Sequence, residues 1–361
     1  MKPIPVGIAG LGRSGWGIHA NTLSSLPEHY QVVAVTDFDA ARRDEAAAKF
    51  GCHTYESYAE LVADPSVELL IVTTPNRFHA PHSIEALRAG KHVLCEKPFG
   101  INSREVDEMI LVAQEVGRIV APFQQRRYEA VFQKVKEIVH SGLLGEIQLI
   151  RHSWHSFSRR WDWQTLSRFD GGQLLNNGPH AVDQALHLFG DQDYELCADL
   201  RNVLSSGDAE DFIKIVLEPK SDSNGRRGPI LDLEMSSCSA FSQDRWLVMG
   251  DSGSLRAGTS KVEWKWVDWS AVPPRPVDAQ PTPNRSYNRE DLPWQEAEWE
   301  DPKDAMSLEL RFYHDLYATL REDKPLVISP QSVQRVMRLI EEVKAKSPVQ
   351  PGRFASGETE Q

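Results

Sequence analysis

The fold is decided by the stretch Ile4-Pro5-Val6-Gly7-Ile8-Ala9-Gly10-Leu11-Gly12-Arg13-Ser14-Gly15. It begins with an apolar run that is β-branched at three positions, which predicts a short buried strand. Gly10, Gly12 and Gly15 then form a turn that leads into a helix-like segment over residues 19–26. Such a turn lets a pyrophosphate approach the backbone and the helix-terminal amides. The pattern therefore predicts a dinucleotide-binding strand–turn–helix unit.

Strands and helices alternate outward from this unit, with strand-like runs at residues 31–36, 53–55, 69–73, 92–95 and 118–123. Strict alternation favours a parallel, doubly wound α/β sheet of about six strands, and hence a Rossmann domain over residues 1–125. Strands dominate after Gly145, which predicts a second α/β domain over residues 126–361 with a largely antiparallel sheet. Helices near residues 304–320 and 330–346 are expected to pack back on the first domain. Residues 261–299 mix tryptophans with prolines, so we expect an ordered, irregular excursion.

Composition excludes several classes of protein. The chain has 361 residues and a net charge of −12, which argues against binding to nucleic acid or an anionic membrane. Its four cysteines are scattered without a CxxC pair, so we expect reduced thiols and no metal site. The sequence shows neither a signal peptide nor an apolar run long enough to span a membrane, and we therefore expect a cytoplasmic protein.

Asp37 follows the second strand, 22 residues beyond Gly15. A carboxylate at this position accepts hydrogen bonds from the ribose hydroxyls of a dinucleotide and repels a 2′-phosphate, which favours NAD over NADP. Arg42 and Arg43 keep NADP as the alternative. The simpler interpretation is a glycine turn without a ligand, in which Asp37 caps a helix.

Two further motifs follow strands four and five. Thr74-Pro75-Asn76 with His79 comes after the fourth strand and is explained equally by turn chemistry or by cofactor contact. The fifth strand ends in Glu96-Lys97-Pro98, at the sheet edge where open α/β sheets bind ligands. Lys97 is therefore a candidate catalytic group of a nicotinamide-dependent oxidoreductase. Alone, this stretch favours the simpler interpretation of a surface Glu-Lys pair on a strand-to-helix loop, and only the other motifs reverse that preference.

A second candidate site lies in the segment from Gly171 to Asp183. Pro179 fits the first helical position, so His180 would lie in the first turn, where a lowered pKa would make it a neutral base. Asp183, three residues on, shares the helix face and could orient His180. The alternative is that His180 packs or caps while Asp183 complements the helix dipole. Arg126 and Trp163 would add groups suited to a sugar.

Together these motifs resemble the Gfo/Idh/MocA family of NAD(P)-dependent oxidoreductases, along nearly the whole chain. The resemblance rests on the glycine turn, Thr74-Pro75-Asn76-x-x-His79, Glu96-Lys97-Pro98, Arg126-Arg127-Tyr128, Leu144-Gly145-Glu146 and the segment from Gly172 to Asp183. It implies a Rossmann domain followed by a domain whose open sheet makes a homodimer or homotetramer. It also implies that Lys97 and His180 line the place where a sugar or cyclitol hydroxyl is oxidised.

Motifs and resemblance together give the expected site. The expected catalytic residues are Lys97, His180 and Asp183. The expected cofactor contacts are Gly10, Gly12, Arg13, Ser14, Gly15, Asp37, Thr74, Pro75, Asn76, His79, Glu96, Lys97 and Gln125. The expected substrate contacts are Lys97, Arg126, His155, Trp163, Asn176, Asn177 and His180.

The sequence departs from the family at Asn176, where an aspartate is frequent. Asparagine cannot take a proton but can still hydrogen-bond to hydroxyls. More of the proton transfer is then left to Lys97 and His180. We expect an enzyme that transfers a hydride between NAD(H) and a secondary hydroxyl or ketone of a sugar or glycoside. Alternatives are a glycoside-processing enzyme that retains NAD and forms a transient 3-keto sugar, and a non-catalytic NAD-binding sensor.

Overall fold

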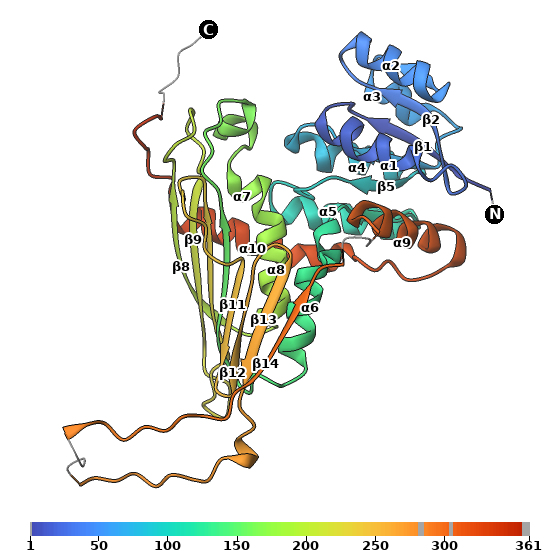
Figure 1. The fold of residues 1–361 in the computed structure, drawn as a ribbon. Helices are drawn as coiled ribbons and strands as arrows, with labels where there is room; N and C mark the ends of the chain where they lie inside the picture. Colours follow the sequence, from blue (N-terminus) through green and yellow to red (C-terminus); the bar gives the residue numbers. More distant parts are fainter. Residues whose placement is uncertain (1, 281–284, 303–305, 356–361) are drawn as a thin grey trace.

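The computed structural model describes residues 2–280, 285–302 and 306–355. Within these residues the first sheet has six strands in the order β3-β2-β1-β4-β5-β6, all parallel, as predicted (Figure 1). Its strands are β1 (Ile4–Ala9), β2 (Tyr30–Thr36), β3 (His53–Tyr55), β4 (Leu69–Val72), β5 (His92–Cys95) and β6 (Val120–Pro122). Every residue of β4 is buried, because parallel strands are covered by helices on both faces.

Helices connect these strands. They are α1 (Asn21–Ser24), α2 (Ala40–Phe50), α3 (Tyr58–Ala63), α4 (His79–Arg88) and α5 (Ser103–Glu115). Helices α2, α3 and α5 begin at side chains that accept hydrogen bonds from their free amides. Ser57 and Glu60 form a capping box at α3, and Asn102 caps α5. The first helix differs from the prediction: a π-helical turn, η1 (Gly15–Ala20), precedes the short α1.

The second sheet has eight strands in the described residues, in the order β14-β13-β12-β11-β7-β10-β9-β8. Its strands are β7 (Ile147–His155), β8 (Tyr194–Arg201), β9 (Phe212–Pro219), β10 (Ile230–Ser236), β11 (Trp246–Gly250), β12 (Gly253–Ala257), β13 (Lys261–Trp266) and β14 (Gln295–Glu300). Only the β7–β10 pairing is parallel, so the predicted, mostly antiparallel sheet is confirmed. The helices α6 (Ala130–His140) and α8 (Gly178–Phe189) pack on one face, with α7 (Gln173–Asn176) before α8 (Figure 1).

The two C-terminal helices, α9 (Leu308–Glu322) and α10 (Pro330–Lys346), join the two halves. Helix α9 lies under the first sheet, where Tyr30 Oη donates to the backbone oxygen of Tyr313 at 2.6 Å (Figure 1). Helix α10 packs against both α5 and α8. The start predicted for α9, Asp304, lies outside the described residues. No helix in the described part of the chain is both long and apolar enough to cross a membrane.

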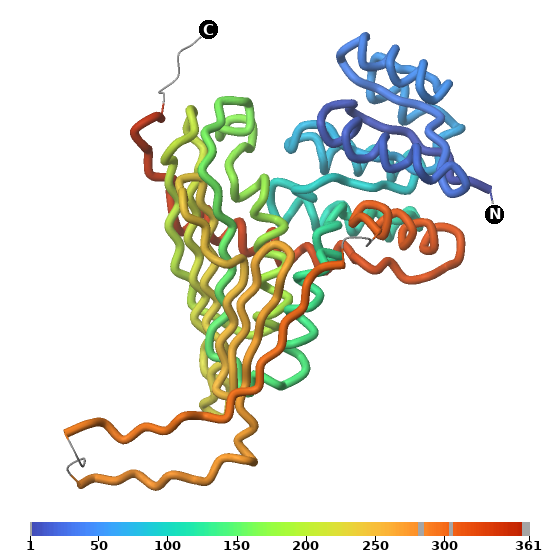
Figure 2. The backbone as a smooth tube through the Cα atoms, in the orientation of Figure 1, coloured from blue at the N-terminus to red at the C-terminus, as the bar shows by residue number. Residues whose placement is uncertain are grey.

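The excursion predicted at residues 261–299 is only partly irregular. Its two ends are β13 and β14, which pair in an antiparallel ladder. The connection between them extends away from the sheet as two separate limbs (Figure 2). An ion pair of 2.8 Å between Arg275 and Glu290 joins the limbs, and residues 281–284 lie outside the described part.

Candidate active site

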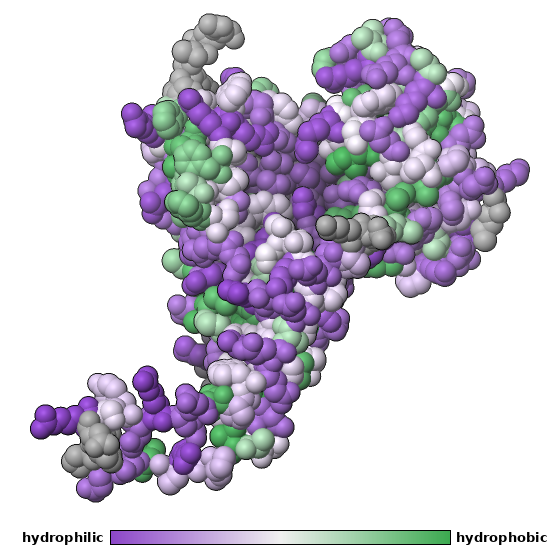
Figure 3. Space-filling view, in the orientation of Figure 1, coloured by the Kyte–Doolittle hydropathy of each residue, from purple (hydrophilic) through white to green (hydrophobic). Residues whose placement is uncertain are grey.

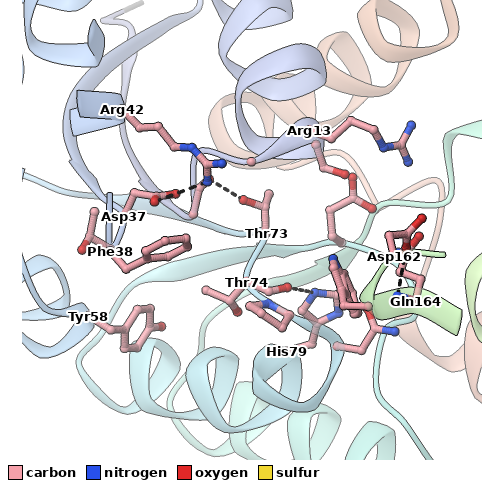
Figure 4. A pocket seen from close by; sticks show the side chains of 18 of the residues that line it. Arg13, Asp37, Phe38, Arg42, Tyr58, Thr73, Thr74, His79, Asp162 and Gln164 are labelled. Atoms are coloured by element: carbon pink, nitrogen blue, oxygen red, sulfur yellow. Dashed lines mark hydrogen bonds and ion pairs between the residues drawn. The ribbon is translucent and has the colours of Figure 1, made fainter. Parts of the chain in front are cut away.

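A cavity of about 590 Å³ lies at the carboxyl ends of the parallel strands. It extends from Asp37, Phe38 and Arg42 at one end to Asp162 and Gln164 at the other (Figure 4). In the space-filling view the surface between the two halves of the molecule is hollowed and mostly hydrophilic (Figure 3). The residues predicted to bind cofactor that line this cavity are Gly10, Gly12, Arg13, Ser14, Asp37, Thr74, Pro75, Asn76, His79, Glu96 and Lys97.

Gly10, Gly12 and Gly15 are required in the turn for different structural reasons. Gly10 has φ +94°, a conformation that other residues adopt only with strain. A Cβ atom on Gly15 would lie 1.9 Å from the backbone oxygen of Gly10, so the turn closes only with glycine there. A Cβ atom on Gly12 would meet nothing within 4 Å. Gly12 therefore leaves open the space in which a pyrophosphate can approach the backbone, and the turn fits a dinucleotide.

Asp37 is buried, and its carboxylate is held by the backbone. Leu11 N donates to Oδ2 at 2.6 Å, and Asp39 N donates to Oδ1 at 2.9 Å. Arg42 Nη1 lies 3.5 Å from Oδ1 (Figure 4). The carboxylate is thereby fixed at the edge of the cavity, with a guanidinium group beside it.

Asn76 and His79 have side-chain partners within the protein. Asn76 Nδ2 donates to the backbone oxygen of Asp170 at 2.9 Å, which connects this turn to the loop before α7. The ring nitrogens of His79 lie 2.7 Å from the backbone oxygens of Thr74 and Pro98. His79 therefore ties the turn after β4 to the turn after β5, and both turns shape the cavity.

Glu96 is a largely buried carboxylate in the wall of the cavity. Its Oε2 accepts from Lys97 N at 2.8 Å, and its Oε1 lies 3.3 Å from His19 Nε2. Burial would raise the pKa of Glu96, but the hydrogen bond and charge of His19, with the charge of Lys97, lower it to about 2. Glu96 is thus ionised throughout the physiological pH range.

Lys97 reaches from the first half of the molecule to the second. Its Nζ donates to both the backbone oxygen and Oδ1 of Asn176, at 3.0 and 3.1 Å. Burial lowers the pKa of Lys97, Glu96 opposes this shift, and the charges of Arg13, Arg126 and Arg160 add to it. The neutral amine is therefore favoured relative to a lysine in water.

His180 lies buried in the first turn of α8, as predicted. Burial, followed by the charges of Lys97 and Arg126, lowers its pKa well below the ordinary value, so the ring is neutral. Its Nδ1 atom has no hydrogen-bond partner among the described residues.

The predicted support of His180 by Asp183 is wrong. Arg127 Nε and Nη2 donate to the two carboxylate oxygens of Asp183, at 2.7 and 2.6 Å. This bidentate pair joins α8 to η3 (Gln125–Tyr128) and uses both oxygens of the carboxylate. Asp183 therefore holds the two elements together and does not orient the imidazole.

His155 is also misplaced by the prediction. Side chains alternate along β7, and His152 Nδ1 faces α8, 3.2 Å from the backbone oxygen of Ala181. Three residues on, His155 lies on the opposite face, with its Nε2 atom 3.0 Å from Glu234 Oε1. His155 therefore points away from His180. Gln125, expected at the cofactor, is buried and is not among the residues that line the cavity.

A second cavity of about 170 Å³ lies beside the first, between the ends of β7 and β10 and the helix α7. Arg160 lines both cavities, and Asn177, expected at the substrate, lines the second. Trp163, also expected at the substrate, lines the first. The lining of the second cavity is mostly polar: Trp154, Ser156, Ser158, Arg160, Gln173, Asn177, Asp211, Met235, Ser236 and Ser237.

Sequence reasoning missed Arg160 and His19. Arg160 donates from Nε and Nη2 to the carboxylate of Asp162, which holds the loop over the cavity. His19 is fully buried between Glu96 and Tyr313, whose hydroxyl lies 2.6 Å from Nδ1. The tryptophans at 161 and 163 were the available signal for the loop, whereas nothing near His19 in the chain indicated its distant partners.

The fold and the cavity define an NAD-binding oxidoreductase. Residues 4–124 match the family model of the oxidoreductase family with an NAD-binding Rossmann fold, and residues 132–256 match the GFO/IDH/MocA C-terminal domain. The chain belongs to the Gfo/Idh/MocA family of oxidoreductases, as the resemblance of its motifs implied.

Relatives and solved structures agree with this assignment. An uncharacterized oxidoreductase of Schizosaccharomyces pombe is 31% identical over 261 residues, 71% of this chain and 70% of the relative. The scyllo-inositol 2-dehydrogenase (NADP(+)) of Bacillus subtilis is 32% identical over 193 residues, 53% of each chain. The crystal structure of an NAD-binding protein from Listeria innocua has a TM-score of 0.73 at 27% identity and covers 96% of this chain and 95% of that chain.

Proposed function

We propose that the protein transfers a hydride between NAD(H) and a secondary hydroxyl or ketone of a sugar or glycoside, with Lys97 handling the hydroxyl proton. The observation that carries this proposal is the position of the Lys97 amine. It lines the cofactor cavity and is held by Asn176, whose neighbour Asn177 lines the second, polar cavity. The bound nicotinamide would supply or accept the hydride, and the substrate would lie where the two cavities adjoin, near Arg160.

The hydrogen bonds of Lys97 suit a base. A neutral amine has two N–H groups, and the two oxygens of Asn176 accept two hydrogen bonds from Nζ. The lone pair then remains free to accept the proton of a substrate hydroxyl. After protonation the third N–H points to the same place and can return the proton to a ketone oxygen, so one group serves both directions.

His180 is proposed as the second polar partner of the substrate oxygen. Its low pKa opposes a stable imidazolium ion, so we assign it hydrogen bonding to the hydroxyl rather than storage of the proton. Asn177 and Trp163 are proposed to bind the remaining hydroxyls and the apolar side of the sugar ring, respectively.

NAD is the proposed cofactor, in preference to NADP. The Asp37 carboxylate is fixed by two backbone amides at the cavity edge, so it can accept from a ribose diol without moving. A 2′-phosphate would meet this negative charge at close range. Arg42, beside Asp37, is the group that would bind NADP if Asp37 turned away. We place the boundary of the nucleotide-binding domain after Gln125.

A panel of sugars, glycosides and cyclitols tests this proposal by the absorbance of NADH formed. Native mass spectrometry in parallel shows whether NAD stays bound. Turnover with release of NADH supports the dehydrogenase. Retained cofactor with glycoside cleavage and no net NADH would favour the enzyme that forms a transient 3-keto sugar. Tight NAD binding without turnover of any compound would favour a sensor and contradict the proposal.

A further inference from the structure

Two guanidinium groups lie against Trp154, which lines the second cavity. The centre of the Arg245 guanidinium is 3.6 Å from the ring centroid, and that of Arg126 is 5.0 Å from it. Both arginines have the same ion-pair partner. Glu129 pairs with Arg126, and its Oε2 atom lies 3.9 Å from Arg245 Nη2. Two positive charges less one negative charge leave one positive charge over this wall of the cavity.

Arg245 is the fixed member of the pair. Its Nε donates to His152 Nε2 at 3.2 Å, and the other ring nitrogen of His152 lies 3.2 Å from the backbone oxygen of Ala181, next to His180. Burial lowers the pKa of Arg245 to about 10, so it stays charged at neutral pH. Its Nη2 is buried without a hydrogen-bond partner in the described residues. Arg245 thus adds positive charge behind Arg126 without reaching the cavity itself.

Arg126 is the member that can meet a ligand. Its side chain is 36% exposed, and within the described residues its guanidinium group donates one hydrogen bond, from Nη1 to Glu129. The backbone oxygen of Arg126 accepts from Gln184 Nε2 at 2.8 Å, which places η3 against α8. The remaining N–H groups lie in one plane, and this planar fork matches the two oxygens of a carboxylate.

Positive charge also dominates around the Lys97 amine. Burial comes first in lowering the pKa of Lys97, but Arg13, Arg126 and Arg160 also lower it, against Glu96 alone. This local excess stands out in a chain whose net charge is −12. Arg13 lines the first cavity at the glycine turn and can be neutralised by a pyrophosphate, whereas Arg126 lies against Trp154, a residue of the second cavity. The oxidised nicotinamide ring would add a further positive charge.

We propose that the substrate carries a carboxylate, as in a uronic or aldonic acid, and that Arg126 binds this group. The proposal rests on the proposed hydride transfer and names its substrate class. A monoanion matches the single uncompensated charge of the Arg126–Arg245–Glu129 cluster, whereas a phosphate dianion would exceed it. The aromatic face of Trp154 holds the guanidinium plane in place for bidentate binding.

Matched substrates test the charge directly. Glucose, glucuronate and glucose 6-phosphate, and galactose with galacturonate, are compared for kcat/KM with NAD. The kcat/KM of each carboxylate is expected to be at least about tenfold higher than that of its neutral sugar. A difference of this size is typical of one charge-assisted hydrogen bond. Equal or better turnover of the neutral sugars, or of the phosphate, would overturn the proposal and leave the hydride transfer standing. No turnover of any compound would instead contradict the proposed function.

Variants of Arg126 test the residue. Arg126→Gln is expected to raise KM for the carboxylate about 10- to 100-fold more than KM for the matched neutral sugar, and Arg126→Lys should give an intermediate ratio. Arg201→Gln makes the same charge change at an exposed position paired with Asp199 and is the control. Arg126→Gln should also raise the kinetic pKa of Lys97, because a nearby cation is lost. Equal effects on both sugars with an unchanged pH profile would make Arg126 structural and refute its assignment.

If Arg126→Gln failed to fold, binding to the wild-type protein still decides the question. Calorimetric titration of the NADH-loaded enzyme with glucuronate and with glucose compares the two ligands without chemistry. Tighter binding of glucuronate that weakens with added salt supports the carboxylate site. Equal binding of the two ligands would refute it.

Discussion

The Nζ atom of Lys97 lies 3.0 Å from the backbone oxygen of Asn176 and 3.1 Å from its Oδ1 atom. The two residues are 79 positions apart in the chain and belong to opposite sides of the cleft. The amine is therefore positioned by a neutral amide rather than by a carboxylate. A substitution of Lys97 removes the amine and its hydrogen bonds, whereas a substitution of Asn176 changes the charge state of the amine.

Lys97→Ala is expected to lower the single-turnover rate about 10²- to 10⁴-fold, the usual loss when a positioned acid–base group is removed. NAD affinity should stay nearly unchanged, because the glycine turn and Asp37 remain. Lys220→Ala, at an exposed position, is the control. A rate above roughly a tenth of the wild-type value, too small a loss for general acid–base catalysis, would show that Lys97 is structural.

Asn176→Asp is expected to raise the pKa of Lys97, because a carboxylate beside the amine favours its charged form. Oxidation needs the neutral amine, so the acidic limb of kcat against pH should move to higher pH. Ketone reduction uses the protonated amine, so the variant should retain its reduction rate to a higher pH than the wild type does. Asn224→Asp, on an exposed turn, is the control. Coincident pH profiles of wild type and variant would contradict a proton-transfer role for Lys97.

Asp37→Ser is expected to narrow the preference for NAD, since it removes the ribose acceptor and the charge that repels a 2′-phosphate. Arg42→Ala in that background should then weaken NADPH binding, because Arg42 is the cation beside position 37. Fluorescence titration with NADH and NADPH measures both effects. NADPH that binds the wild type as tightly as NADH would reverse the cofactor assignment.

Glu96→Gln tests the buried carboxylate through pH. The pKa of Glu96 is lowered from 4.5 to about 2 in the folded protein, so its ionised form stabilises the fold above the unfolded pKa. This contribution, roughly 3 kcal/mol, is lost as pH falls from about 4.5 toward 2. Denaturant unfolding of wild type and variant should therefore differ near neutral pH and converge in acid. Glu108→Gln, an exposed carboxylate, should show no such difference.

An oligomer is expected through the face of the second sheet that α6 and α8 leave uncovered. That face carries alternating charges, with Lys214 Nζ between Asp232 and Glu234 and Arg151 beside Asp232. Light scattering at micromolar concentration should give the mass of a dimer or tetramer. If so, reversing the charge of Lys214 with Lys214→Glu should weaken the assembly, whereas a monomer mass for the wild type would refute the expectation.

Features set by neighbours in the chain could be predicted from the sequence. The alternating elements, the glycine turn, the Ser57 cap and the first-turn position of His180 all depend on residues a few positions apart. The partners of Asp183 and His155 could not be predicted, because Arg127 and Glu234 are 56 and 79 positions away. The alternation of side chains along β7 defines the two faces of the strand. Which of these faces lies against α8, and hence near the site, is known only from the packing of α8 in the structure.

The contacts of Tyr313 join residues that the ribosome synthesises far apart in time. Its hydroxyl lies 2.6 Å from His19, 294 positions earlier, and its backbone oxygen accepts from Tyr30, 283 positions earlier. His19 in turn contacts Glu96 at the cofactor cavity. During synthesis the six-stranded sheet emerges long before α9, and until then His19 Nδ1 and Tyr30 Oη lack the partners that Tyr313 provides. The nucleotide-binding half therefore completes these contacts only when α9 has left the ribosome.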